Sequence, residues 1–90
     1  MKSIILDLIP NKEMGLITAK RISKITGHTE STIRKVINEA RAQGIPICST
    51  KFGYYYSTED RDIADTVNFL TRRVNTQLQA INGLKNTKEI

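Results

Sequence analysis

Five side chains that can hydrogen-bond the edges of nucleic-acid bases stand close together in the sequence: Ser31, Thr32, Arg34, Lys35 and Asn38. Lysine and arginine pair with guanine, asparagine pairs with adenine through two bonds, and serine or threonine bonds either kind of edge. An apolar stripe at helical spacing crosses the same segment, at Ile33, Val36, Ile37 and Ala40. Burial of the stripe would turn Ser31, Lys35 and Asn38 outward, with Thr32 and Arg34 on the flanks. The pattern predicts a base-reading helix, against the alternative of a solvated face.

Positive charge is concentrated between Thr18 and Tyr56. This stretch holds seven cations and two anions, a balance of +5 that equals the formal net charge of the whole chain; they are Lys20, Arg21, Lys24, Arg34, Lys35, Arg41 and Lys51 against Glu30 and Glu39. Charge gathered on one motif is what neutralising DNA phosphates requires. We therefore expect phosphate contacts from a second group of side chains, which set register without reading sequence: Thr18, Lys20, Arg21, Lys24 and Lys51. An ordinary exposed turn lysine is the alternative for Lys51.

Two helices and a hairpin are predicted to position these side chains. Thr18 suits the N-cap of a helix that buries Ala19, Ile22 and Ile25 and ends at Gly27. Thr29 suits the N-cap of a longer helix that runs to about Gln43 and is closed by Gly44. Residues 45–56 then predict a β-hairpin whose alternation directs Tyr54 and Tyr56 toward the core and Tyr55 outward. A short helix, a glycine turn and a longer helix are typical of a helix-turn-helix.

The N-terminal segment is predicted to close the core. Ser3 suits the cap of a helix to about Ile9 that places Ile5, Leu6 and Ile9 on one side, and Pro10 stops it. Leu16 and Ile17 predict a short extended piece that pairs with the hairpin. The longest apolar run, 4–6, is too short for a membrane span, and no secretory signal is evident, so we expect a cytoplasmic protein. A single cysteine, Cys48, leaves no internal disulfide.

The run ITAKRISKITGHTESTIRKVINEARAQGIPICSTKFGYYYS, residues 17–57, resembles the winged helix-turn-helix of biotin-repressor type. That type carries a helix, a turn, a second helix, "LR..G..I" and a wing that ends in "GY"; here ARAQGIPI stands at 40–47 and GYYY at 53–56. The run is also similar to small winged-helix proteins of phage early regions. The resemblance covers about residues 4–56 and implies DNA binding. The ligase and effector-binding activities of that type do not carry over, because no catalytic domain follows the motif.

A long amphipathic helix is predicted after the hairpin, capped by Ser57 or Thr58 and stopped at Asn82-Gly83. We call its apolar positions the seam: Ile63, Val67, Leu70, Val74, Leu78 and Ile81. A strict 3.5-residue period continues instead through Gln77 to Ile81 and Leu84. The seam predicts a homodimer with half-sites about one DNA turn apart and a near-palindromic operator. The alternative is a helix folded back on the first helix, and Phe69, off the seam, suggests a contact with the globular part.

Taken together, the sequence predicts an α+β, mostly helical chain: a winged helix-turn-helix over 1–57, a dimerisation helix over 58–84 and a frayed tail over 85–90. The expected function is sequence-specific double-stranded DNA binding by a small, phage-like transcriptional regulator, with helix 29–43 in the major groove and hairpin 45–56 as wing. The alternative is a winged-helix adaptor that binds a protein partner in a replication or transcription complex. We expect no enzyme, cofactor, metal or small-molecule ligand, because the sequence lacks a phosphate loop and a ligand cluster, and His28 stands in the turn.

Overall fold

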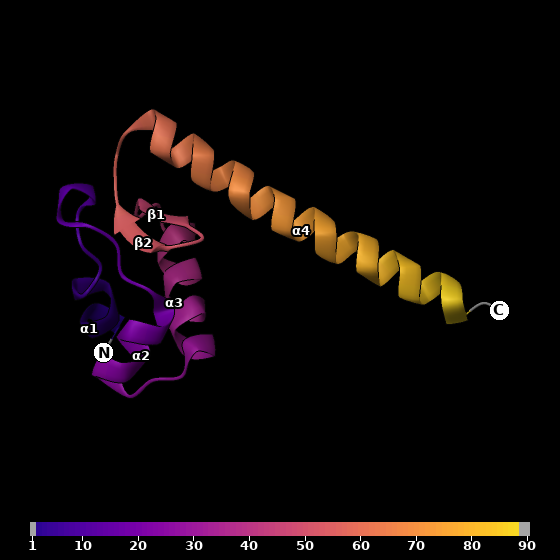
Figure 1. The fold of residues 1–90 in the computed structure, drawn as a ribbon, viewed down its shortest axis with the longest axis horizontal. Coiled ribbons are helices and arrows are strands. Elements are labelled where there is room, and N and C mark those ends of the chain that lie inside the picture. The colour runs from indigo at the N-terminus through magenta and orange to yellow at the C-terminus, as the bar shows by residue number, and fades with distance from the viewer. Residues whose placement is uncertain (1, 89–90) are drawn as a thin grey trace.

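The computed structural model describes residues 2–88, and it is an α+β arrangement that is mostly helical (Figure 1). In chain order the elements are α1 (Lys2–Asp7), the 3-10 helix η1 (Lys12–Met14), α2 (Ala19–Thr26), α3 (Glu30–Ala42), β1 (Ile47–Thr50), β2 (Gly53–Tyr56) and α4 (Asp60–Lys88). The strands form one antiparallel hairpin. The predicted fold class is confirmed at this level.

The core lies where α1, α2 and α3 meet beneath the hairpin. Its buried residues come from all of these elements: Ile5, Ile9, Ala19, Ile22, Ile33, Ile37, Ala40 and Ile47. The predicted stripe of α3 is confirmed, with Val36 partly buried at its edge. The predicted burial of Ile25 is wrong, because its side chain is 54% exposed. The reason is geometric, since each step of three residues falls short of a full helical turn, and Ile25 has rotated off the face set by Ala19 and Ile22.

Threonine caps fix the beginnings of α2 and α3. The Oγ1 of Thr18 accepts a hydrogen bond from the amide of Arg21, and the Oγ1 of Thr29 accepts one from the amide of Thr32. Gly27 ends α2 in the left-handed conformation, with φ 81°. Each of these three local signals was predicted correctly, because caps and turns depend on residues next to one another in the chain.

The first helix is shorter than predicted. It ends at Asp7, since the amides of Leu8 and Ile9 donate to the carbonyls of Ile5 and Leu6 in a tighter turn before Pro10. Ser3 lies inside α1, so the helix begins earlier in the chain than the prediction placed it. Ile5 and Ile9 are nevertheless buried and Leu6 is half-buried, as expected of this segment.

The hairpin pairs Ile47 with Tyr56 and Thr50 with Gly53. Ile17 forms a single bridge to Tyr54, with N···O distances of 3.1 and 2.7 Å, so the expected extended piece is reduced to one residue. Tyr54 and Tyr56 pack on the core as predicted. Tyr55, predicted outward, is 7% exposed. Alternation was read correctly, but the second face of the hairpin is covered by the start of α4.

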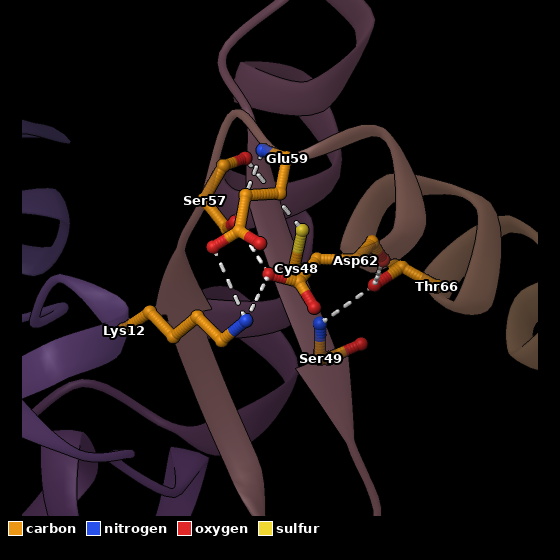
Figure 2. Close-up of polar contacts among 7 residues, drawn as sticks. All are labelled: Lys12, Cys48, Ser49, Ser57, Glu59, Asp62 and Thr66. Carbon is orange, nitrogen blue, oxygen red and sulfur yellow. Dashed lines mark hydrogen bonds and ion pairs between the residues drawn. The ribbon is translucent and has the colours of Figure 1, made fainter.

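A polar cluster joins α4 to the hairpin (Figure 2). The hydroxyl of Ser57 accepts from the amide of Glu59 and donates to Asp62 Oδ2 at 2.6 Å. Lys12 Nζ lies 2.9 Å from Asp62 Oδ2 and 3.2 Å from Glu59 Oε2. The helix begins at Asp60, later than a cap at Ser57 or Thr58 would give.

Thr66 adds a second attachment, since its Oγ1 accepts from the amide of Ser49 at 3.2 Å and donates to the carbonyl of Asp62. Beyond these turns α4 leaves the body and runs away from α1 instead of folding back on it (Figure 1). It passes Gly83 without a break and continues to Lys88. The predicted stop at Asn82-Gly83 and the predicted tail are thus wrong for 85–88, while 89–90 lie outside the described residues. Over residues 2–88, no helix is both long and apolar enough to cross a membrane.

Candidate nucleic-acid interface

All five predicted base-reading side chains of α3 are exposed. Within the described part of the chain, Ser31, Lys35 and Asn38 make no side-chain hydrogen bond or ion pair. Thr32 Oγ1 accepts from Thr29 Oγ1 at 3.0 Å, and Arg34 Nη2 lies 3.3 Å from Glu30 Oε1 one helical turn earlier. Three of the five groups are therefore free to meet a ligand, while two are already engaged in local contacts.

A cleft of about 590 Å³ separates α3 and the hairpin from α4, and we call it the α3–α4 cleft. Its walls come from four elements: Thr18 to Lys20 at the start of α2; Glu30, Arg34, Asn38 and Arg41 of α3; Ser49 to Lys51, Gly53 and Tyr54 of the hairpin; and Phe69, Leu70, Arg73, Val74 and Gln77 of α4. The α3 residues recur once per turn and so share one flank of that helix.

The cleft divides the predicted base readers into two groups. Arg34 and Asn38 line it, whereas Ser31, Thr32 and Lys35 do not. Ser31 and Lys35 are four residues apart and share the outer face of α3. Asn38 borders both groups, since it is exposed and also reaches the cleft wall.

The predicted phosphate contacts are exposed as well. Lys20, Arg21 and Lys24 are exposed on α2, and Thr18 is exposed although its hydroxyl also caps the helix. Lys51 is exposed at the hairpin turn, where its Nζ lies 5.2 Å from the centroid of the Phe52 ring. These side chains flank α3 from the preceding helix and from the hairpin.

Arg41 is the exception among the seven cations. It is half-buried, its Nε donates to the Ile47 carbonyl at 2.8 Å, and its Nη2 donates to Ser49 Oγ at 3.0 Å. Its guanidinium lies over the ring of Tyr54, at 5.8 Å from the centroid. Burial lowers the pKa of Arg41 from its ordinary value, yet arginine remains charged at neutral pH. Arg41 therefore ties α3 to the hairpin and offers few donors to a ligand.

Two residues of α4 were missed by the sequence analysis. Arg73 and Gln77 line the α3–α4 cleft, and the Arg73 guanidinium lies 5.7 Å from the centroid of the Phe69 ring. Phe69 is half-buried on the same wall, and its expected contact with the globular part stays a prediction. The sequence did carry a signal, since Phe69, Arg73 and Gln77 are four residues apart and so share one face of the helix. That this face borders the cleft depends on how α4 docks on the hairpin.

The seam of α4 is largely open. Ile63, Val67, Val74, Leu78 and Ile81 are 39 to 54% exposed, and Leu84 continues the row at 70%. Leu70 is half-buried, next to the cleft. The seam is thus a row of apolar side chains that α4 does not bury against its own chain.

Comparison of the chain with protein-family models, with curated proteins and with solved structures gave no match.

Proposed function

We propose that this protein is a sequence-specific double-stranded DNA-binding regulator, with α2 and α3 as a helix-turn-helix and the hairpin as its wing. The observation that carries the proposal is that Ser31, Lys35 and Asn38 are exposed and unengaged on α3, beside the exposed cations of α2. A helix of this length enters the major groove with its first turns, where these three groups match the hydrogen-bonding atoms of base edges.

The surrounding cations would hold the helix in register. Lys20, Arg21 and Lys24 on α2 approach one strand, as expected of the helix that crosses the backbone in this motif. Lys51 approaches from the hairpin turn. Each of these contacts releases counterions, so binding should weaken steeply as salt rises.

The first prediction distinguishes the side chains that contact base edges from those that contact phosphates. Lys35→Ala and Asn38→Ala should each cost about 1 to 3 kcal/mol on the preferred site and relax its sequence preference, because each removes a contact to a base edge. Lys20→Ala should weaken all duplexes alike and reduce the salt slope by about one, because it removes a phosphate contact. The measurement is duplex binding at several salt concentrations, on a site selected from random sequence and on a scrambled duplex.

Arg72→Ala is the control, since it removes one charge from the side of α4 that faces away from the cleft. Equal losses on selected and scrambled duplex for every substitution would refute the assignment of the reading residues. A salt slope near zero for the unaltered protein would instead favour the adaptor that binds a protein partner.

We further propose that two copies pair through the seam of α4. Most of the seam is exposed, and the helix carries the exposed Asp60 in its first turn and the exposed Lys85 near its other end. An antiparallel pair places these opposite charges side by side and also opposes the two helix dipoles. A two-fold dimer presents its two reading helices to an inverted repeat in the DNA.

A further inference from the structure

One wall of the α3–α4 cleft is formed by α4, which lies outside both the helix-turn-helix and the hairpin. Arg73 and Gln77 face α3 and the hairpin across an open cleft. The neighbouring Arg72 does not line the cleft and lies instead in a shallow depression with Asp65, Asn68 and Thr71. Two adjacent arginines of α4 therefore lie on different sides of the helix, and only Arg73 lines the cleft.

The cleft is strongly cationic. Five of its lining residues are basic, Lys20, Arg34, Arg41, Lys51 and Arg73, and one is acidic, Glu30. Glu30 pairs with Arg34, and Arg41 is bonded to Ile47 and Ser49, so both of those arginines are engaged. The cations left to face a ligand, Lys20, Lys51 and Arg73, come from α2, the hairpin turn and α4. Cations spread over three walls suit an extended polyanion better than a single small anion.

The position of the cleft beside α3 indicates which polyanion fits. A helix in the major groove has one sugar-phosphate strand on each side of it, and the cleft borders α3 along one flank. The cleft also offers the apolar ring of Phe69, which lies off the seam and against which a sugar ring can pack. Asn38 lies at the boundary between the cleft and the reading face, so a strand in the cleft would adjoin the bases read by α3.

We propose that the α3–α4 cleft binds the sugar-phosphate backbone of one strand of the duplex, and that Arg73 of α4 contacts its phosphates. This inference rests on the proposed DNA-binding function and extends it to the last helix. The ring of Phe69 holds the Arg73 guanidinium at the cleft wall, at 5.7 Å from the ring centroid. In this arrangement α4 is part of the DNA-binding surface as well as the element that carries the seam.

The test compares the two adjacent arginines. Arg73→Gln should weaken duplex binding about 5-fold at moderate salt, the size of one exposed charge contact, and lower the salt slope by about one. The loss should be the same on selected and scrambled duplex, since a phosphate contact reads no sequence. Arg72→Gln makes the same chemical change one residue away and should leave affinity and slope near those of the unaltered protein. Arg73→Lys should restore most of the slope, because it keeps the charge.

The outcomes separate this inference from the function on which it rests. Duplex binding with a steep salt slope that Arg73→Gln leaves unchanged would overturn the inference and leave the DNA-binding function standing. Equal losses for Arg72→Gln and Arg73→Gln would also overturn it, since they would report net charge alone. A loss confined to single-stranded DNA would assign the cleft to a separate strand and overturn it as well. If the unaltered protein does not bind duplex at all, both proposals fail together. Circular dichroism of each variant confirms that the helices are retained.

Discussion

At the scale of single residues, the contact between Lys12 and Asp62 makes stability depend on pH. The hydroxyl of Ser57 and the ammonium of Lys12 hold the pKa of Asp62 below its ordinary 3.8. Hydrogen bonds to Asp62 and Glu59 hold the pKa of Lys12 above its ordinary 10.5. A lowered carboxylate pKa stabilises the fold above pH 3.8, and this stability is lost as pH falls through the folded value. A raised lysine pKa stabilises it below pH 10.5, and this is lost as pH rises through the folded value.

Asp62→Asn should therefore lower the free energy of unfolding at neutral pH and make its decline toward pH 3 shallower. The substitution keeps the size of the side chain but removes the charge that Lys12 contacts at 2.9 Å. Urea unfolding at pH 3, 5 and 7 is the measurement. Asp65→Asn, on an exposed position of the same helix, is the control and should change neither quantity appreciably. Parallel pH curves for Asp62→Asn and the unaltered protein would contradict the assignment of this contact.

At the scale of elements, the approach of the hairpin to residue 17 depends on Gly53. Gly53 has φ 147°, and a Cβ at this position would lie 2.7 Å from the Ile17 carbonyl oxygen and 2.9 Å from its carbon. Both atoms belong to the Ile17 carbonyl, whose oxygen accepts a hydrogen bond from the Tyr54 amide, so the carbonyl cannot move aside without loss of that bridge. Gly53→Ala should thus cost about 2 kcal/mol or more, from backbone strain and displacement of the bridge.

Gly83→Ala provides the matched control for that substitution. Gly83 lies inside α4, and nothing lies within 4 Å of its added Cβ. Alanine there should favour the helix by up to about 1 kcal/mol. Thermal unfolding of both variants is the measurement, and a melting temperature for Gly53→Ala equal to that of the unaltered protein would show that the bridge tolerates a side chain.

Some features of these elements could be predicted from the sequence alone, and others could not. The caps at Thr18 and Thr29 and the stripe of α3 were predictable because they depend on residues within one or two turns. The burial of Tyr55 was not, since it requires knowing that Thr66 anchors α4 to Ser49, seventeen positions earlier in the chain. Arg41 shows the same limit for the site: its charge is visible in the sequence, but its bonds to Ile47 and Ser49 appear only once the hairpin folds back on α3.

At the scale of the whole molecule, the free length of α4 dominates the shape. The radius of gyration is 15.4 Å, whereas a compact chain of this length has about 12 Å. The extents of 51, 32 and 23 Å describe a body with one long projection (Figure 1). Only the first turns of α4 are attached to the hairpin, and the seam residues beyond Leu70, Val74, Leu78 and Ile81, are 47 to 53% exposed. A helix with this exposed row is the element expected to pair with a second copy.

The last prediction concerns that pairing. Removal of all residues after Ser57 would uncover Tyr55 and Cys48, so point substitutions in the free half of α4 are the sharper test. Leu78→Glu with Ile81→Glu places two charges on the seam and should weaken self-association roughly 100-fold, because charge cannot be buried there without a partner. Thr76→Glu with Gln79→Glu adds the same charge to exposed positions roughly opposite the seam and should leave association unchanged. Sedimentation equilibrium measures the mass of each form, and a dimer that survives Leu78→Glu with Ile81→Glu would remove the seam from the interface.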